Sequence, residues 1–496
     1  MIQNYENYRK HMAKVADINY SCAMLGWDQE TYMPEGASDL RSRQLSTLSG
    51  LAHQLFTDAA FGDLLATLKD DTSLSAAEKS NVLNTIDDYK KQTCLSTDFV
   101  EAMSKAISQS FNAWQKARQD NNFKLFAPHL KEIIALKKEE TSRKGYTNVY
   151  DGMLDTHEKG LTIQKLDALF SDVREQLVPF IKKIAASKQV DDAFMFKQYP
   201  SDLQWQYSLD VLKHIGFDFN TGRQDKSTHP FTTSFGSADV RVTTRISEHD
   251  LSEIIWSTIH EGGHALYEQG LPVSEYGLPA SEAAGLGLHE SQSRLWENNV
   301  GRSLPFWENQ FSKLLNVFPA QLSGVSTDDF YRGMNKVQPS FIRTSADELT
   351  YHLHIMIRYE IEKAMVFDEV SVEDLPALWN SKYKSYLGID VPDDKTGILQ
   401  DVHWSHGSLG YFPTYSVGSF YAAQFFAAAT HQIPALKTTI AEGNCHPLLT
   451  WLRENIHQYG RRFTSEELCK KICGEGLNFS HFMKYATEKY TYIYSL

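Results

Sequence analysis

The chain has 496 residues, of which 42% are hydrophobic and 12% aromatic, enough to build a large core and too many for a disordered chain. Its net charge is −13, and the absence of a basic block argues against nucleic acid and anionic membrane as partners. The N-terminal residues mix charges and contain no apolar stretch typical of a secretory signal. The longest apolar run, from Phe420, is about half the length of a membrane-spanning helix. The five cysteines indicate no disulfide framework. We therefore expect a soluble, cytoplasmic protein.

Helical periodicity dominates the first third of the chain. Apolar residues recur at three- and four-residue spacing in six segments: 1–25, 38–68, 76–92, 97–120, 127–142 and 163–188. Proline and glycine mark the breaks, as at Pro34 and Gly160. There is no internal repeat and no long flexible linker. The sequence predicts a mainly α fold, a large helical single body that forms one domain over residues 1–496.

One segment departs from the helical pattern. HPFTTSFGSADVRVTTRI, from His229, alternates β-branched and polar residues on either side of a Gly-Ser-Ala turn, which predicts a short β-hairpin. Either FTTSF or VRVTT could pair with an extended peptide as an added strand.

The next helix carries the motif HEGGH at residues 260–264, and we expect the helix to begin at Ser247. His260 and His264 are one turn apart, so both imidazoles can reach one ion. A catalytic zinc site uses three protein ligands and a water, and Glu261 lies beside this face, where it can take a proton from that water. The alternative is a helix with two surface histidines.

The two glycines inside this motif are unfavourable for a helix. Gly costs about 1 kcal/mol relative to Ala in a helix interior, and Gly262 and Gly263 are adjacent. We predict that they leave room for the substrate backbone next to the metal.

The third metal ligand is not fixed by spacing. The continuation HEGGHALYEQG lacks the distant histidine of the HExxHxxGxxH pattern. The segment that begins at Ser281 is predicted to be helical and offers three acids of the right type: Glu282, Glu290 and Glu297. The residues alone do not choose among them.

Six short motifs occur in order along the chain: HPF (229–231), DVRVT (239–243), HEGGH (260–264), HESQ (289–292), IRTSAD (342–347) and GILQDVHW (397–404). With GWDQETYMP (26–34) and GYFPTYSVG (410–418), they make the sequence resemble the carboxypeptidase Taq family of metallocarboxypeptidases. The resemblance covers nearly the whole chain.

This resemblance implies a mostly helical homodimer with a deep active-site groove, related in architecture to angiotensin-converting enzyme and neurolysin. It implies His260, His264 and Glu290 as metal ligands and Glu261 as the general base. The metal would be Zn²⁺, for which Co²⁺ can substitute. The substrates would be peptides with a free C-terminus, which lose single amino acids with broad specificity, proline being disfavoured.

Peptide hydrolysis also needs donors for the developing oxyanion. His403, His406, Tyr411 and Tyr415 lie within one 13-residue segment. Because similar enzymes use a histidine and a tyrosine, we favour Tyr415 with either His403 or His406, and we assign Tyr411 to substrate binding. The alternative is an aromatic cluster that only packs.

An exopeptidase must bind the terminal carboxylate, and the planar fork of arginine fits it. Arg343 and Arg241 are the candidates, and the resemblance favours Arg343. An ion pair with Asp239 is the alternative role for Arg241. We expect His229 and His289 to make hydrogen bonds around the site rather than to bind the metal.

Two rival functions remain. A zinc endopeptidase or dipeptidyl-peptidase would use the same chemistry, and only the end of the substrate groove would differ. A catalytically inactive helical scaffold would be expected to lack part of the metal motif, yet every required group is present.

Overall fold

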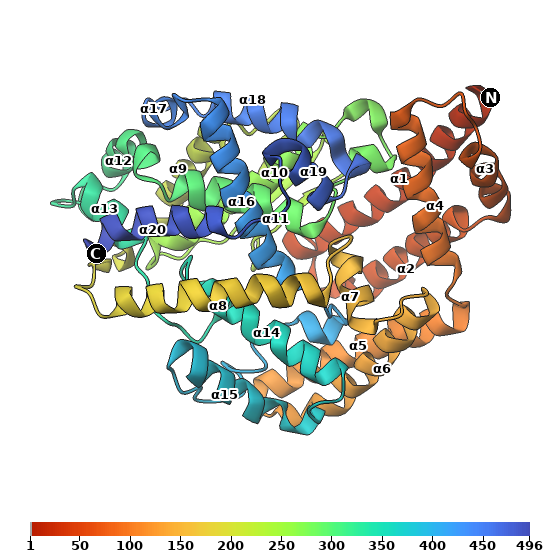
Figure 1. Cartoon of the computed structure of the whole chain (residues 1–496), viewed down its shortest axis with the longest axis horizontal. Helices are drawn as coiled ribbons and strands as arrows, with labels where there is room; N and C mark the ends of the chain where they lie inside the picture. The colour runs from red at the N-terminus through yellow and green to blue at the C-terminus, as the bar shows by residue number, and fades with distance from the viewer. Residues whose placement is uncertain (1) are drawn as a thin grey trace. The chain divides into compact units, whose positions relative to one another are not determined.

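The computed structural model describes residues 2–496 and is mainly helical, as predicted (Figure 1). The six helical segments predicted at the N-terminal end are found as the following helices: α1 (Ile2–Thr31), α2 (Ser38–Phe56), α3 (Ala59–Lys69), α4 (Ala76–Thr93), α5 (Thr97–Gln119), α6 (Ala127–Arg143) and α8 (Ile163–Ala185). The predicted helix 38–68 is two helices, because the Asp58 carboxylate caps a new helix by accepting from the Ala60 N–H. No helix in the described part of the chain has the length and apolarity needed to cross a membrane.

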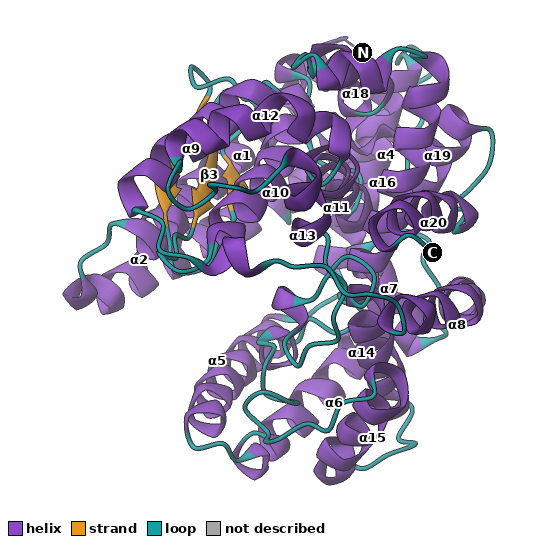
Figure 2. Ribbon diagram, turned by 90° about the vertical axis from the view of Figure 1, so that its left-hand side faces the viewer, coloured by secondary structure: helices purple, strands orange, loops and turns teal. Residues whose placement is uncertain are grey.

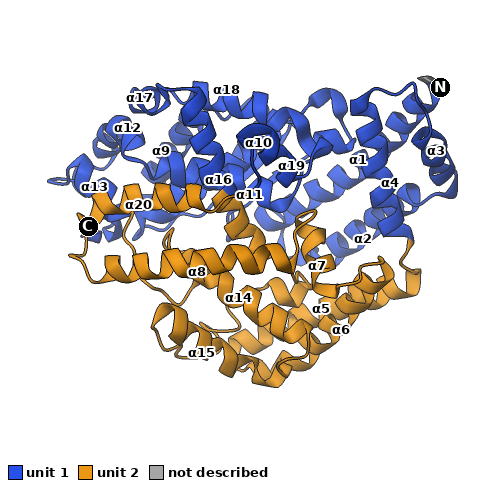
Figure 3. Ribbon diagram, viewed as in Figure 1, with its two compact units in different colours: residues 1–93, 191–334, 421–476 blue, residues 94–190, 335–420, 477–496 orange. Residues whose placement is uncertain are grey.

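The chain divides into two compact units (Figure 3). Unit 1 comprises residues 1–93, 191–334 and 421–476, and unit 2 comprises residues 94–190, 335–420 and 477–496. Besides α1 to α4, unit 1 contains α9 (Ser201–Ile215), α10 (Leu251–Gly270), α11 (Leu286–Arg294), α12 (Leu304–Val317), α13 (Thr327–Met334), α17 (Leu436–Ala441), α18 (His446–Asn455) and α19 (Ser465–Cys473).

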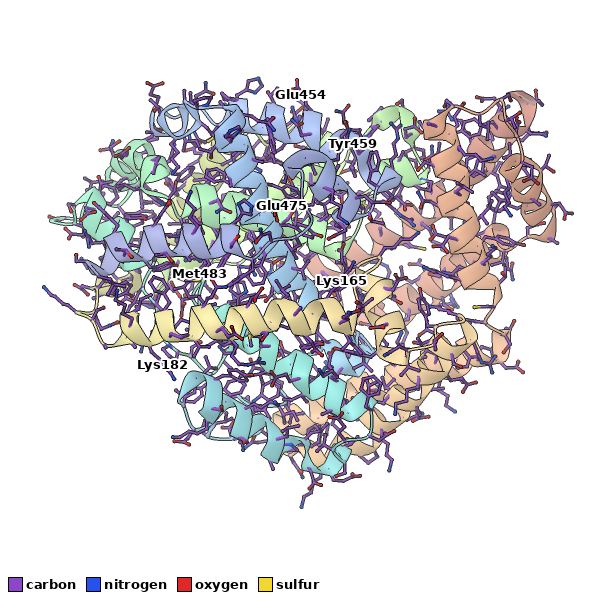
Figure 4. The ribbon with its side chains drawn as sticks, in the orientation of Figure 1. Lys165, Lys182, Glu454, Tyr459, Glu475 and Met483 are labelled. Carbon is purple, nitrogen blue, oxygen red and sulfur yellow. The ribbon has the colours of Figure 1, made fainter. Side chains whose placement is uncertain are left out.

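Unit 2 contains the helices of residues 94–190, 335–420 and 477–496. Besides α5, α6 and α8, these are α7 (Val149–His157), α14 (Tyr351–Val366), α15 (Leu375–Leu387) and α20 (Ser480–Tyr494), and α16 (Pro413–Gln432) contributes its first residues here and the rest to unit 1. Amphipathic spacing explains these helices. In α8, for example, Leu166 and Phe170 are buried, whereas Lys165 and Lys182, labelled in Figure 4, are exposed near its two ends.

Unit 1 contains a three-stranded sheet of order β1-β3-β2, drawn in orange in Figure 2. The predicted hairpin is confirmed: β2 (Thr232–Ser234) pairs antiparallel with β3 (Val240–Thr244). A third strand, β1 (Gly222–Lys226), pairs parallel with β3 and was not predicted, because its sequence GRQDK lacks an apolar alternation. VRVTT is therefore the central strand with both edges occupied, and the prediction that it could accept a peptide is wrong. TTS of β2 is an edge strand.

Helix α10 carries HEGGH and packs against α9, α11 and β3. It begins at Leu251, not at Ser247, because the Asp250 carboxylate accepts from the Ser252 N–H and caps the helix there. Ser247 instead forms an isolated bridge with Asp250.

The space beside the two glycines of HEGGH is filled, so the prediction that they leave room for substrate is wrong. A Cβ added to Gly263 would lie 2.7 Å from the Gln292 carbonyl oxygen and 2.7 Å from the Ser293 Cα, both in α11. A Cβ added to Gly262 would lie 2.7 Å from Cδ2 of Leu212 and 2.8 Å from Cδ1 of Ile215, both in α9. The glycines therefore allow α9 and α11 to approach α10 closely.

We predict that Gly263→Ala destabilises the protein more than Gly262→Ala does. The first substitution meets backbone, which cannot move aside, whereas the second meets the ends of flexible side chains. Overpacking costs about 1–3 kcal/mol, which exceeds the gain of about 1 kcal/mol in helix propensity. Thermal unfolding of the two variants measures the difference. Equal or higher stability of Gly263→Ala would show that α11 does not depend on this contact.

Candidate metal centre

Three side chains of unit 1 converge within α10 and α11. The ligand atoms of His260, His264 and Glu290 all lie within 4.8 Å of one another. Oε2 of Glu290 is 3.4 Å from Nε2 of His264 and 3.7 Å from Nε2 of His260. This arrangement depends on the close α10–α11 packing, since Glu290 is on α11. The group is the kind of two-histidine, one-carboxylate set that holds a catalytic metal.

Glu290 is turned toward the histidines by its neighbours. Its Oε1 accepts a hydrogen bond of 2.7 Å from Nε of Arg294, one turn further along the chain, and Oε2 accepts one of 3.2 Å from the Ser293 hydroxyl. Glu290 is 6% exposed, so this carboxylate is fixed in a dry environment. Oε2 is left on the side of the imidazoles.

Glu297 lies behind the first histidine. Its Oε2 is 2.9 Å from Nδ1 of His260 and 3.1 Å from Nη1 of Arg294, and its Oε1 is 3.1 Å from Nη2 of Arg302. Glu297 belongs to a π-helical segment, η6 (Leu295–Gly301), that continues α11; such segments are frequent at functional sites. A carboxylate on Nδ1 makes Nδ1 the protonated nitrogen and directs Nε2 at the site.

Glu282, the third acid considered in the sequence, lies outside this group. Its carboxylate pairs with Arg461 at 2.6 Å, and 43% of its side chain is exposed. Of the three acids, the structure therefore places Glu290 at the two histidines, Glu297 behind His260 and Glu282 elsewhere.

Glu261 is buried beside the histidines. Its Oε2 accepts a 2.7 Å hydrogen bond from the Thr232 hydroxyl, and the same hydroxyl is 2.9 Å from the Glu261 carbonyl oxygen. Thr232 is on β2, so the predicted hairpin holds this glutamate in place. Burial raises the pKa of Glu261 above its usual value.

A second hydroxyl of β2 reaches the same helix about two turns further on. Ser234 donates a 2.7 Å hydrogen bond to Glu268, whose other oxygen is 2.9 Å from Nε2 of His289. The His289 ring stacks on His264, with 4.4 Å between centroids. His289 thus supports a ligand candidate, as predicted, whereas His229 is exposed.

Two of the three ligand candidates, His264 and Glu290, are held in the protonation state that binds metal. Burial lowers the pKa of His264 to about 3 and keeps its imidazole neutral. Burial acts the same way on His260, but the carboxylates of Glu290 and Glu297 outweigh it and raise its pKa. Burial raises the pKa of Glu290, yet Arg294 and the histidines outweigh it and hold that pKa well below the usual range. An ionised carboxylate and a neutral imidazole are the forms that bind metal.

In unit 2, Arg343 is buried in a cluster with a second arginine. Its Nε and Nη2 lie 3.0 and 2.9 Å from Oδ1 of Asp401, and its Nη1 donates to the Tyr351 hydroxyl at 3.0 Å. Arg358 pairs with the other oxygen of Asp401 at 2.7 Å. Burial raises the pKa of Asp401, but the two arginines outweigh it and hold that pKa well below its usual range. Two arginines share one carboxylate, so the group of three carries one excess positive charge.

The histidine–tyrosine pair in unit 2 involves His403. Its Nε2 is 3.2 Å from the Tyr415 hydroxyl, and burial lowers its pKa to about 3. Tyr411 packs against both rings, with centroids 5.2 Å from His403 and 5.3 Å from Tyr415. His406 is exposed and packs on Phe111 of α5 instead. Of the two histidines left open by the sequence, His403 is therefore the one that meets Tyr415.

Arg241 is engaged within unit 1. It forms a bidentate ion pair with Asp239, with two contacts of 2.9 Å, and its guanidinium lies 4.4 Å from the centre of the Trp27 ring. Arg223 of the neighbouring strand covers the same ring at 5.3 Å. The motif GWDQETYMP thus packs α1 onto the sheet, and Arg241 has the ion pair considered as its alternative role.

Several residues around the metal group were missed by sequence reasoning: Thr232, Glu268, Arg294 and Arg302. The signal was weak. Arg294 follows Glu290 by four residues, a spacing at which charge pairs are usual on exposed helices. Arg302 follows Glu297 by five residues, a spacing that predicts no pair on an α-helix. Only the burial of this segment shows that they are internal.

Comparisons with known proteins agree with the geometry. The family model of the carboxypeptidase Taq (M32) metallopeptidases matches residues 7–490. Carboxypeptidase 1 of Bacillus subtilis is 38% identical over 98% of this chain and 97% of its own, and thermostable carboxypeptidase 1 of Thermus thermophilus is 38% identical over 99% and 98%. The M32 carboxypeptidase structure from Deinococcus radiodurans superposes with a TM-score of 0.98 at 38% identity over all of both chains. These findings confirm the resemblance seen in the sequence: the chain belongs to the carboxypeptidase Taq family and is a metallocarboxypeptidase, a peptide hydrolase that uses a metal cofactor.

Proposed function

We propose that the metal is zinc and that His260, His264 and Glu290 bind it. The observation that carries this proposal is the convergence of the three ligand atoms, with Glu261 beside them. Ligands at about 2.0–2.2 Å from a tetrahedral zinc lie about 3.3–3.6 Å apart, close to the 3.4 and 3.7 Å that separate Glu290 from the two histidines. Bound zinc would acidify a water and polarise the scissile carbonyl. Cobalt would support the same chemistry.

Glu261 would act as the general base. Its carboxylate is fixed by Thr232 next to the histidines, and its raised pKa suits a group that first takes a proton from the attacking water and then gives it to the leaving amine.

Arg343 would bind the terminal carboxylate of the substrate. The cluster of Arg343, Arg358 and Asp401 carries an excess positive charge in a buried environment, and such a charge is stabilised by an added anion. The existing pair with Asp401 fixes the guanidinium, so less entropy is lost on binding. Arg241, already bound to Asp239, is the weaker candidate.

Tyr415 would donate to the oxyanion, with His403 as its partner. Their contact of 3.2 Å supports this pair over the pair with His406, and Tyr411 would contribute to substrate binding. We further propose that both units form one catalytic domain, that substrate pairs with the edge strand β2, and that the enzyme is a cytoplasmic homodimer with a deep groove, related in architecture to angiotensin-converting enzyme and neurolysin.

The proposed reaction is release of single C-terminal amino acids with broad specificity, proline being disfavoured. An endopeptidase or dipeptidyl-peptidase activity is the alternative. Peptides amidated at the C-terminus distinguish them, because a carboxypeptidase that binds a free carboxylate cleaves amides poorly, whereas an endopeptidase cleaves both forms at similar rates.

The three acids should differ in their effect on metal content. Glu290→Gln should lose most of the metal, since a ligand is weakened. Glu297→Gln should lower affinity about 10- to 100-fold, as is usual when a partner of a metal-bound histidine is removed. Glu282→Gln is the matched control and should bind normally. Metal titration of the three variants tests the order, and full retention by Glu290→Gln would refute the ligand assignment.

Glu261→Gln should retain the metal and lose activity. General-base catalysis contributes about 10²–10⁴-fold, and the amide cannot accept the proton. Steady-state kinetics on the metal-loaded variant measures the loss. A variant with a third of normal turnover would exclude Glu261 as the base.

Arg343→Ala should lower kcat/KM on free-acid peptides by about 30- to several thousand-fold. Truncating one partner of a buried charge pair costs about 2–5 kcal/mol, and about 1.4 kcal/mol corresponds to tenfold. Metal content should not change, and Lys should rescue poorly because it lacks the fork. Arg241→Ala is the control. An equal loss in both variants would place the carboxylate site elsewhere.

A further inference from the structure

A buried glutamate of unit 2 has no role in the chemistry described so far. Glu362, on α14, is fully buried, and its carboxylate accepts three hydrogen bonds. Oε1 accepts from the Trp404 indole N–H at 2.8 Å. Oε2 accepts from the Gly410 backbone N–H at 2.8 Å and from the Tyr150 hydroxyl at 2.7 Å.

Two of these donors belong to the segment of the candidate oxyanion donors. Trp404 directly follows His403, and Gly410 directly precedes Tyr411. One carboxylate therefore joins the two ends of the turn 404–410. Four residues earlier on the same helix, Arg358 holds Asp401, two residues before His403. Helix α14 thus bonds to this segment on both sides of His403, through Asp401 before it and Trp404 after it.

The backbone conformation and the close packing of Gly410 also restrict the turn. Gly410 has a φ of +80°, and a Cβ there would lie 2.8 Å from the Met153 carbonyl carbon and 2.9 Å from the Leu154 nitrogen. The backbone at Gly410 is therefore in close contact with α7, and in this position its N–H donates to Glu362. Burial raises the pKa of Glu362 to about 7, although the bonds from Tyr150, Gly410 and Trp404 oppose the shift. The buried Glu362 side chain is the acceptor for three buried donors, which would be costly to leave without one.

We infer that Glu362 is a positioning residue for the reaction: its carboxylate clamps the turn 404–410 and so sets the places of His403, Tyr411 and Tyr415. This inference rests on the proposed role of Tyr415 and His403 as oxyanion donors. Such donors must be held within a fraction of an ångström, because their effect depends on geometry in the transition state.

Glutamine cannot replace this carboxylate in either orientation. With its amide nitrogen at the Oε1 position, it faces the Trp404 indole N–H. With its nitrogen at the Oε2 position, it faces the Gly410 N–H. Neither of those donors can rotate to become an acceptor, so Glu362→Gln must release one end of the turn. Tyr150→Phe removes the third bond only, keeps both turn contacts and is the matched control.

The test compares Glu362→Gln, Tyr150→Phe and Tyr415→Phe as metal-loaded enzymes. Glu362→Gln should lower kcat about 10- to 100-fold, less than or equal to the loss of an oxyanion donor, with KM and metal content nearly unchanged. Tyr150→Phe should retain kcat within about twofold.

Hydrogen exchange of the peptide that contains Gly410 should accelerate at least about tenfold in Glu362→Gln and stay normal in Tyr150→Phe. Should Glu362→Gln fold poorly, Trp404→Phe, which removes the Oε1 contact alone, should show the same kcat loss and exchange.

The outcomes separate the two ideas. If Tyr415→Phe loses activity while Glu362→Gln keeps normal kcat and normal exchange, the clamp is refuted. If Tyr415→Phe remains fully active, the proposed oxyanion role fails, and with it the catalytic part of the clamp; unchanged exchange would then remove the structural part as well. Equal losses in Glu362→Gln and Tyr150→Phe would also overturn it, since general destabilisation would explain both.

Discussion

The candidate metal ligands His260, His264 and Glu290 depend on one arginine, Arg294, that donates hydrogen bonds to two carboxylates. Arg294 donates to Glu290 through Nε and to Glu297 through Nη1. Glu290 in turn lies against His264, and Glu297 contacts His260. Glu290 is turned toward the histidines by Arg294, and Glu297 is fixed on Nδ1 of His260. With Arg302 on the other oxygen of Glu297, two acids and two arginines balance in charge. Removing one partner of such a buried group costs about 3–5 kcal/mol, so the site is also part of what holds α11 and η6 in place.

Close helix packing is the second constraint. Gly263 lets the backbone of α11 approach α10, and this approach brings Glu290 to the two histidines. The unfavourable glycines of HEGGH are therefore explained by the helices on either side and not by a substrate. The same helix receives two hydroxyls from β2, one on Glu261 and one on Glu268. A three-residue edge strand thus fixes the side chain of the proposed general base.

Much of this could be predicted from the sequence. The helices, the hairpin and the family followed from periodicity and from motifs in order, and HExxH placed His260 and His264 on one face because helical spacing is local. Glu290 could not be distinguished from Glu282 by spacing, because the difference lies in the path of the chain between α10 and α11. The sequence does not predict β1, because its residues are polar. It predicts a cap at Ser247 because Ser247 and Asp250, three residues apart, offer the same capping chemistry. The roles of Arg294 and Glu362 depend on burial, which charged residues do not reveal in a sequence.

We propose that one zinc ion is bound by His260, His264 and Glu290, with Glu297 behind His260. Anomalous diffraction from zinc-loaded crystals, measured on both sides of the zinc absorption edge, tests it most directly. We expect one peak per chain, about 2.0–2.2 Å from Nε2 of both histidines and from Oε2 of Glu290, while Glu297 stays bonded to Nδ1 of His260. A peak at another place, or one coordinated by Glu297 in place of Glu290, would show that these three residues are not the ligands.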